Sequence, residues 1–279
     1  MKNDTGIIWL ASYPKSGNTW LRIFLSRILY NTQNINQLQI PIYSSKAFIE
    51  LESEIDISEL TIEELHQLRL DVFDEFAKNK IFPVKIHDSF KQYFYQYPFL
   101  PFSKTKIAIY LIRNPFDVVI SFSRHLGLTI DETIELMNNE KFTMAANENK
   151  YQIQIPQHLG SWSNHVKSWT EQRLIPVYIV RYEDMIQNSY ETFKNILNKC
   201  KIPFTEEKLT DAISFSSFTN LQKQEEKYGF EEKSVHSQKF FHTGKAYYYK
   251  NLLNLGQIQK IMKHHKEIIT KFNYLPEYL

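Results

Sequence analysis

The stretch Tyr13–Trp20 (YPKSGNTW) carries the residues best suited to bind a phosphate. It follows a short apolar run, Ile7–Ala11, which is long enough for a buried strand and too short for a helix. Beyond the turn residues, apolar side chains return at helical spacing: Trp20, Leu21, Phe24, Leu25, Ile28 and Leu29. A strand, a tight loop and a helix direct free backbone N–H groups and the positive end of a helix dipole at an anion. The pattern therefore predicts a phosphate-binding loop, with an ordinary strand-to-helix turn as the alternative.

This loop is close to the nucleotide-triphosphate loop G-x-x-x-x-G-K-[ST] but differs at two positions. The segment Ser12–Thr19 keeps the second glycine, Gly17, and the final hydroxyl of Thr19. A serine replaces the first glycine, and Asn18 replaces the lysine. A lysine is present three residues earlier, at Lys15. The loop can still bind one phosphate through N–H and hydroxyl groups, but it lacks the lysine that reaches a γ-phosphate.

A lysine and a histidine end a second predicted strand, Ile81–Ile86. Side chains alternate across a strand, so Lys85 and His87 point to one side and Val84 and Ile86 to the other. Together they form an electropositive site with a group able to accept a proton near neutral pH. Because K-x-H is a weak pattern, a surface strand end with two solvated side chains is the alternative.

An arginine follows a third predicted strand, the apolar run Lys106–Ile112. Arg113 lies just before a helix that begins at Pro115, so its guanidinium can bind a phosphate or carboxylate at two points. Ser121 lies two turns inside that helix and could add a hydroxyl. The alternative is an ion pair between Arg113 and Asp117.

Strands and helices that alternate along the chain must position these groups. Strands are predicted over Ile7–Ala11, Ile81–Ile86, Lys106–Ile112 and Pro176–Val180. Further helices are predicted from Thr61 (with a capping box) to about Asn79, from Pro115, and over Asp131–Met137, Gln157–Gln172, Tyr190–Lys199, Glu206–Ile213 and Asn254 to about Phe272. This alternation predicts an α/β fold in which one parallel sheet is flanked by helices, in a single domain over residues 1–279. Ligands of such sheets bind at the carboxyl ends of the strands.

Composition limits the partners of the chain. Its 279 residues can bury a substantial core, and a net charge of +2 gives no electrostatic case for nucleic acid or membrane as a partner. The single cysteine, Cys200, excludes an intrachain disulfide and any multi-cysteine metal site. No run approaches membrane-spanning length, so we expect a soluble, cytoplasmic protein. The polar stretches Asn138–Gln154 and Gln222–Lys239 are expected to be a flexible insertion and a mobile loop or lid.

Taken in chain order, these motifs resemble those of the sulfotransferases that use 3′-phosphoadenosine 5′-phosphosulfate (PAPS). Tyr13–Trp20 is similar to that family's 5′-phosphosulfate loop, YPKSGTTW, and Lys85-Ile86-His87 to its K-x-H catalytic element. Arg113–Ser121 (RNPFDVVIS) resembles its 3′-phosphate segment, and Tyr182–Met185 (YEDM) a strand end whose tyrosine lies near adenine. The resemblance spans nearly the whole chain and is greatest to soluble bacterial members of the family.

The resemblance implies a set of donor-binding residues. They are Lys15, Ser16, Gly17, Asn18, Thr19, Trp20, Arg113, Ser121, Tyr182 and Phe218. The loop would hold the 5′-phosphate, and Arg113 with Ser121 would hold the 3′-phosphate that distinguishes PAPS from ATP. Trp20 would stack on adenine, with a core tryptophan in an amphipathic helix as the alternative. Phe218 would be a second adenine contact.

The resemblance also implies the reaction, an in-line transfer of the sulfuryl group of PAPS to a hydroxyl or amine of a small-molecule acceptor. His87 would take the acceptor's proton, Lys15 would neutralise charge on the bridging oxygen, and Lys85 would support the equatorial oxygens. No metal ion is expected. An apolar or aromatic acceptor would suit a candidate lining for which ordinary packing is the favoured alternative: Phe90, Tyr93, Tyr95, Phe142 and Tyr151.

The chain departs from the family's C-terminal signature R-K-G-x-x-G-D-W-K, which closes over the 3′-phosphate. The corresponding run, His242–Lys250 (HTGKAYYYK), keeps Gly244 but has His242 in place of the arginine. We hypothesise that Lys245, with a partly protonated His242, supplies the missing positive charge.

Two other functions remain open, a non-catalytic protein that binds PAPS or its diphosphate product PAP, and a nucleotide kinase. Lys15 and His87 argue against the first, because a binding protein needs neither, and Asn18 argues against the second. Asn254-Leu255 replace the Thr-Val of the family's dimer pattern, so the oligomeric state is left open.

Overall fold

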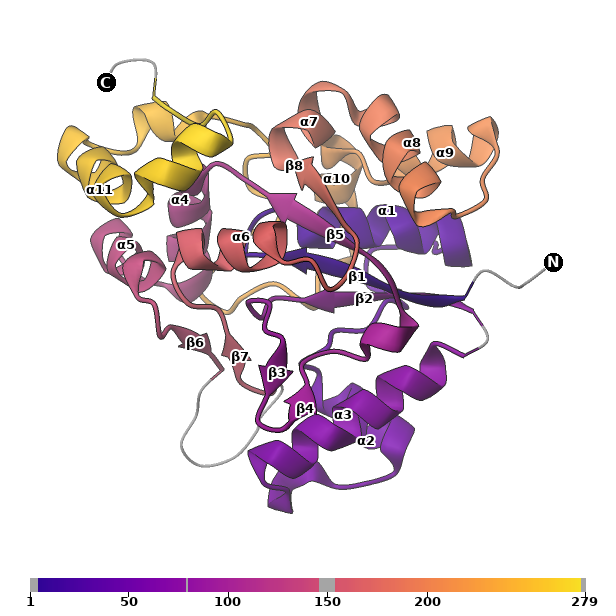
Figure 1. The fold of residues 1–279 in the computed structure, drawn as a ribbon. Helices are drawn as coiled ribbons and strands as arrows, with labels where there is room; N and C mark the ends of the chain where they lie inside the picture. Colours follow the sequence, from indigo (N-terminus) through magenta and orange to yellow (C-terminus); the bar gives the residue numbers. More distant parts are fainter. Residues whose placement is uncertain (1–4, 79, 146–153, 277–279) are drawn as a thin grey trace.

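Four parallel strands form the central sheet of the chain, in the order β2-β1-β5-β8 (Figure 1). The computed structural model describes residues 5–78, 80–145 and 154–276. The strands are Gly6–Ser12 (β1), Ile81–Ile86 (β2), Thr105–Ile112 (β5) and Val177–Arg181 (β8). The four strands predicted from apolar runs are therefore confirmed, with ends displaced by at most about one residue, which is the usual uncertainty of such boundaries.

Helices cover both faces of this sheet, as predicted. Along β1, Trp9 packs into the core on one face and Leu10 into the core on the other, which is the period-two pattern of a strand buried on both sides. One face packs against α1 (Asn18–Tyr30), α8 (Ser189–Cys200) and α9 (Glu206–Phe215). The core on the other face includes α3 (Ile62–Phe76), α4 (Pro115–Leu126), α6 (Trp162–Glu171) and α11 (Leu255–Lys271).

The remaining elements are short. They are the helices α2 (Lys46–Ser53), α5 (Ile130–Asn138), α7 (Tyr182–Gln187) and α10 (Phe218–Tyr228), the 3₁₀ turns Ile57–Glu59, Phe102–Lys104 and Tyr248–Asn251, and the strand pairs β3–β4 (Tyr93–Phe94, Tyr97–Pro98) and β6–β7 (Thr143–Met144, Gln157–His158). Local sequence explains several helix starts. The predicted capping box at Thr61 is present, and a second capping box, between Asn254 and Gln257, begins α11. Asn114 caps α4, where Pro115 occupies the first turn.

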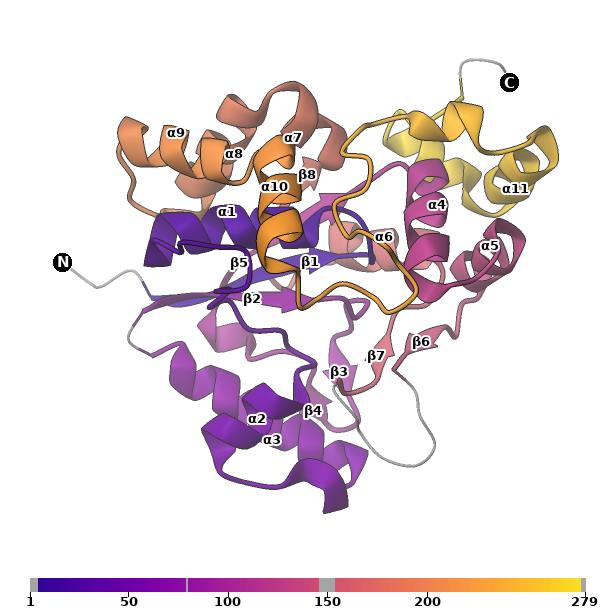
Figure 2. The ribbon, with the colours of Figure 1, turned by 180° about the vertical axis from the view of Figure 1, so that it is seen from behind.

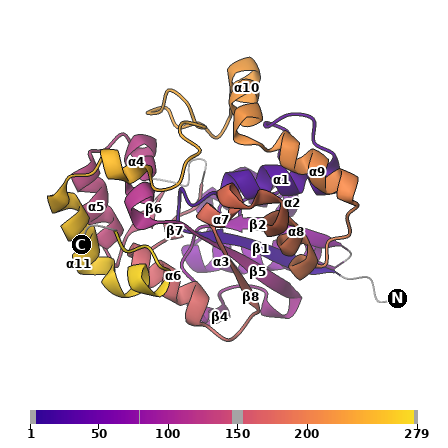
Figure 3. The same ribbon diagram turned by 90° about the horizontal axis from the view of Figure 1, so that it is seen from above.

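Two predicted elements differ from the structure. The helix expected from Gln157 begins only at Trp162, because residues 157–158 pair with β6 and Ser161 caps the helix. The mobile loop expected from Gln222 is wrong over its first part, because residues 222–228 belong to α10. The polar stretch has an apolar anchor after all, since Leu221 packs with Ile23 of α1 and with Phe230 and Phe241. Figure 3 shows α10 on the outer side of α1.

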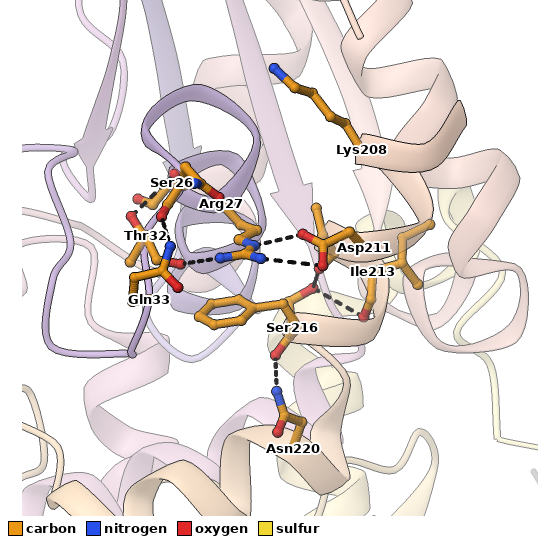
Figure 4. Close-up of polar contacts among 12 residues, drawn as sticks. Ser26, Arg27, Thr32, Gln33, Lys208, Asp211, Ile213, Ser216 and Asn220 are labelled. Carbon is orange, nitrogen blue, oxygen red and sulfur yellow. Dashed lines mark hydrogen bonds and ion pairs between the residues drawn. The ribbon is translucent and has the colours of Figure 1, made fainter. Parts of the chain in front are cut away.

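The junction between α9 and α10 is tied to the end of α1 (Figure 4). Arg27 donates hydrogen bonds to both carboxylate oxygens of Asp211 and to the Thr32 carbonyl, and its guanidinium lies 5.0 Å from the centre of the Phe215 ring. Asn220 donates to the Phe215 carbonyl at 2.7 Å. These contacts hold the residue that begins α10, Phe218, beside the first helix.

Candidate active site

A cavity of about 410 Å³ lies at the carboxyl ends of β1, β2 and β5. Most of the predicted site residues line it: Lys15, Gly17, Asn18, Thr19, Trp20, Lys85, His87, Arg113, Ser121, Tyr182, Phe218, His242 and Gly244. Two predicted residues do not line it. Ser16 is buried and Lys245 is exposed. Segments far apart in the sequence thus meet at the edge of the sheet where a parallel α/β fold binds its ligand.

The loop between β1 and α1 is shaped to bring its backbone close to a ligand. Lys15 adopts a left-handed conformation with φ 68°, and Gly17 has φ 101°. A Cβ atom at Gly17 would lie 2.7 Å from the Tyr182 ring, so only glycine fits there. Asn18 donates hydrogen bonds back to the Leu10 carbonyl at 2.7 Å and to the Ser12 hydroxyl at 3.1 Å. Asn18, which replaces the lysine of the nucleotide-triphosphate motif, therefore holds the loop against β1 through these hydrogen bonds.

His87 is held as a neutral base. Its Nδ1 lies 2.7 Å from the Ser12 carbonyl oxygen, which only accepts, so Nδ1 carries the proton and Nε2 has a free lone pair. Burial, with the nearby Lys85 charge, lowers the pKa of His87 well below 6.5. The His87 carbonyl oxygen accepts a hydrogen bond from His165 at 2.9 Å, which fixes the backbone. The surface-end alternative for Lys85 and His87 is excluded, because each is only 9% exposed.

Two lysines bring positive charge to the cavity. The backbone of Lys85 is bonded on its outer side to the Pro41 carbonyl (2.9 Å) and the Tyr43 N–H (2.8 Å), which orients its side chain. Burial lowers the pKa of Lys85 to about 8. Burial and the charges of Lys85 and Arg113 lower the pKa of Lys15 to about 8. At both ammonium groups the effect of burial outweighs the nearby negative charge, which favours an anionic ligand.

Arg113 lies on the other side of the loop. Its guanidinium donates to the Lys15 carbonyl at 2.9 Å and lies 4.1 Å from the centre of the Tyr182 ring. The carboxylate of Asp117 instead accepts the backbone N–H groups of Tyr247 (2.6 Å) and Tyr249 (2.9 Å). Asp117 thus binds the backbone of the C-terminal segment, whereas the Arg113 side chain lines the cavity.

The C-terminal segment of the site accommodates its departures from the family pattern. Tyr247, which replaces the second glycine, adopts the left-handed conformation with φ 57°, and its N–H is bound to Asp117. Gly244 has φ 59°, and a Cβ atom there would lie 2.4 Å from the Phe218 ring. The retained glycine therefore lets the chain pass directly over Phe218.

Sequence reasoning missed the arginine nearest this segment. Arg124 lies on α4, one helical turn after Ser121, and lines the cavity. Its guanidinium nitrogen lies 3.3 Å from Nδ1 of His242 and 3.5 Å from the Thr243 hydroxyl. Burial and the Arg124 charge lower the pKa of His242, which favours the neutral imidazole over the charged form that the sequence hypothesis needs. The i, i+3 spacing from Ser121 is the signal that could have found Arg124.

An acidic residue in the cavity was also missed. Glu232 follows α10 and accepts hydrogen bonds from Arg22 and from the Thr19 hydroxyl (3.4 Å). Its carboxylate lies 3.9 Å from the Lys85 ammonium. Burial raises its pKa, but Arg22 and Lys85 outweigh that effect and lower the pKa to about 2. Glu232 lies in the polar stretch expected to be mobile, and nothing in its spacing distinguishes it there.

Four of the five aromatic residues suggested for an acceptor site do not line the cavity. Phe90 packs on Trp169 with ring centres 5.2 Å apart, and Phe142 packs against the core. Tyr93 and Tyr95 belong to the exposed hairpin around β3, and Tyr151 lies outside the described residues. Other residues that line the cavity, outside the predicted set, include Ile42, His125, Met144 and Gln154.

Comparisons with known proteins show one family over nearly the whole chain. A family model for the sulfotransferase domain matches residues 6–273. Sulfotransferase 1B1 of Mus musculus is 26% identical over 227 residues, which cover 79% of this chain and 67% of that protein. Flavonol 3-sulfotransferase of Flaveria bidentis is 25% identical over 274 residues, which cover 92% of this chain and 79% of that protein. The matches to the first mammalian relatives span about two thirds of their length.

Solved structures share the fold at lower identity. Retinol dehydratase in complex with androsterone and PAP superposes with a TM-score of 0.62 at 16% identity, over 98% of this chain and 83% of that one. Mouse sulfotransferase SULT7A1 complexed with PAP superposes with a TM-score of 0.58 at 19% identity, over 98% of this chain and 86% of that one. Within the described residues, none of the helices combines the length and the apolar character needed to cross a membrane.

Proposed function

Because the chain belongs to the sulfotransferase domain family, we propose that it transfers the sulfuryl group of PAPS to a hydroxyl or amine of a small molecule. One observation carries this proposal. A loop suited to a 5′-phosphate, the Lys85 and His87 pair, and Arg113 with Ser121 line a single cavity. The PAP bound in the solved neighbours supports the same donor here.

The cavity has groups that suit a nucleotide with two phosphates. At the start of α1, the buried Ser16 hydroxyl has no hydrogen-bond partner among the described residues, and it lies in the loop where a 5′-phosphate would sit. At the other end, Ser121 and the guanidinium groups of Arg113 and Arg124 would hold the 3′-phosphate. Trp20, Tyr182 and Phe218 provide aromatic surface for adenine between the two. Trp20 also packs on Phe193 with ring centres 5.6 Å apart, so it serves the core as well.

His87 would act as the base. PAPS supplies an activated sulfuryl group, and catalysis then depends on position and charge. The free Nε2 of His87 would accept the acceptor's proton while Nδ1 stays bound to the Ser12 carbonyl. Lys85 would stabilise the transferring oxygens, and Lys15 would stabilise the oxygen that gains charge as PAP leaves.

The acceptor would lie beside His87, against Ile42, Met144 and Gln154. Two apolar side chains and one amide suit a small molecule with an apolar body and a polar reacting group. Acceptors of the relatives, such as a flavonol, fit that class, and we propose the same class here.

The kinase alternative is disfavoured by Asn18, whose amide is bound to β1 rather than free to reach a γ-phosphate. Thermal unfolding distinguishes the remaining functions. PAP should raise the melting temperature without magnesium, whereas a kinase would respond to ATP with magnesium. Transfer of ³⁵S from labelled PAPS to a panel of phenols, alcohols and amines then separates an enzyme from a protein that only binds PAP. Stabilisation by ATP with magnesium alone would overturn the proposal.

A further inference from the structure

The segment that carries Glu232, residues 229–243, forms a strap across the cavity. Figure 2 shows the chain leaving α10 and running across to α4. The hydroxyls of Ser234 and Ser237 donate to the carbonyls of His125 (2.6 Å) and Arg124 (2.9 Å), which lie in the last turn of α4. Near its other end, the strap's Phe240 N–H is bound to the Glu225 carboxylate of α10. The strap is therefore attached at several points rather than loose.

Inside this strap, Glu232 makes its contacts with groups already assigned to the donor. The Thr19 hydroxyl belongs to the phosphate loop, and the Lys85 ammonium belongs to the sulfuryl site. The third partner, Arg22, lies one turn after Thr19 on α1 and is only 3% exposed. The Glu232 carboxylate thus lies where three hydrogen-bonding or cationic groups converge at the start of α1.

The charges of this cluster call for an anion. Arg22 and Lys85 are both buried cations, and burying a cation without a partner is costly. Glu232 neutralises them in the absence of a ligand. A sulfonate has the same charge and the same ability to accept hydrogen bonds on several oxygens. Both groups cannot occupy the cluster together, because their like charges would repel each other at contact distance.

We propose that Glu232 is an internal anion that occupies the sulfonate site of the donor, and that the strap must release it before PAPS can react. The inference rests on the proposed function, since it assigns Thr19 and Lys85 to the donor. It adds Arg22, which then binds the sulfonate in place of Glu232. PAPS therefore binds only to the fraction of molecules with the strap released, and this reduces its apparent affinity in proportion.

Glu232→Gln tests this, with Glu231→Gln as the matched control. Glu231 is the neighbouring carboxylate of the same strap; it is exposed and also lines the cavity, so Glu231→Gln controls for the loss of one negative charge near the nucleotide. If the strap is closed in about nine molecules of ten, Glu232→Gln binds PAPS about tenfold more tightly. PAP lacks the sulfonate, so its affinity should rise by only about threefold or less. Calorimetric titrations of both nucleotides into the wild type and the two variants measure this.

A second measurement follows the strap without any ligand. Lys233 and Lys239 are exposed on the strap and are cleavable by trypsin. Glu232→Gln should be cut there about fivefold faster than the wild type or Glu231→Gln, because local opening exposes the strap to the protease. Equal affinities for PAPS in all three proteins, or equal gains in the two variants, would overturn the inference. If no protein bound PAP at all, the proposed function itself would fail.

Discussion

At the scale of single residues, the site combines the neutral imidazole of His87 with two lysines, Lys15 and Lys85, that lose their protons more readily than usual. His87 is oriented by the Ser12 carbonyl and kept uncharged by burial. His87→Asn can keep the hydrogen bond to Ser12 through its amide but cannot accept a proton. We expect turnover to fall about a hundredfold or more, while PAP affinity changes by less than about twofold. Transfer of ³⁵S from PAPS, together with calorimetry, measures both, and retained turnover would remove His87 as the base.

The pKa values predict an asymmetric pH profile. The pKa of His87 is lowered well below 6.5, so the free enzyme keeps its base through neutral pH and loses it only in stronger acid. The pKa values of Lys15 and Lys85 are lowered to about 8, so these groups are charged below that pH and neutral above it. The value of kcat/KM for PAPS should therefore be flat from about pH 6.5 to 7.5 and decline above about pH 8. An acid limb centred near 6.5 would contradict this.

The charge that replaces the family's C-terminal arginine is open to a direct test. Arg124 lines the cavity beside His242, whereas Lys245 is exposed. Arg124→Gln should weaken PAP about tenfold and leave AMP, which has no 3′-phosphate, within about twofold. Lys245→Ala should change neither. A loss of PAP affinity in Lys245→Ala would instead support the original sequence hypothesis for that lysine.

At the scale of elements, sequence patterns located the loops and strand ends because their spacing is local. Strand, loop and helix around Tyr13–Trp20, and the K-x-H strand end, each follow from a few adjacent residues. Arg124 and Glu232 escaped prediction because their roles depend on partners far away in the chain. The helix α10 escaped because its apolar partners are on α1 and in the strap rather than on its own periodic face.

The contact between the C-terminal segment and α10 predicts a pair of glycine variants. Gly244 and Gly229 both have positive φ, 59° and 69°, and Gly229, with ψ −175°, lies in a region that is essentially restricted to glycine. Alanine therefore strains the backbone at either position, by about 1–3 kcal/mol. Only at Gly244 does the new Cβ atom meet a neighbour, the Phe218 ring at 2.4 Å. Gly244→Ala should displace Phe218 and weaken PAP about tenfold, while Gly229→Ala should leave PAP affinity within about twofold. Equal affinities in calorimetry would remove Phe218 from the adenine site.

At the scale of the whole molecule, we propose that residues 1–279 form one domain, as the sequence alternation predicts. The cores on the two faces share one sheet, which favours a single cooperative transition. PAP at a hundred times its Kd should add about 2.7 kcal/mol and raise the melting temperature of that one transition by about 5 °C. Calorimetry that resolved two transitions, with only one moved by PAP, would indicate two domains.

The most direct measurement is a crystal structure of the protein with PAP. The account predicts the 5′-phosphate at the start of α1 against Ser16 and Thr19, and the 3′-phosphate on Arg113 and Arg124. Because PAP has no sulfonate, Glu232 should stay beside Lys85 and Arg22 and release only the Thr19 hydroxyl to the 5′-phosphate. PAP bound outside this cavity, or in it with the 3′-phosphate far from both arginines, would contradict the account.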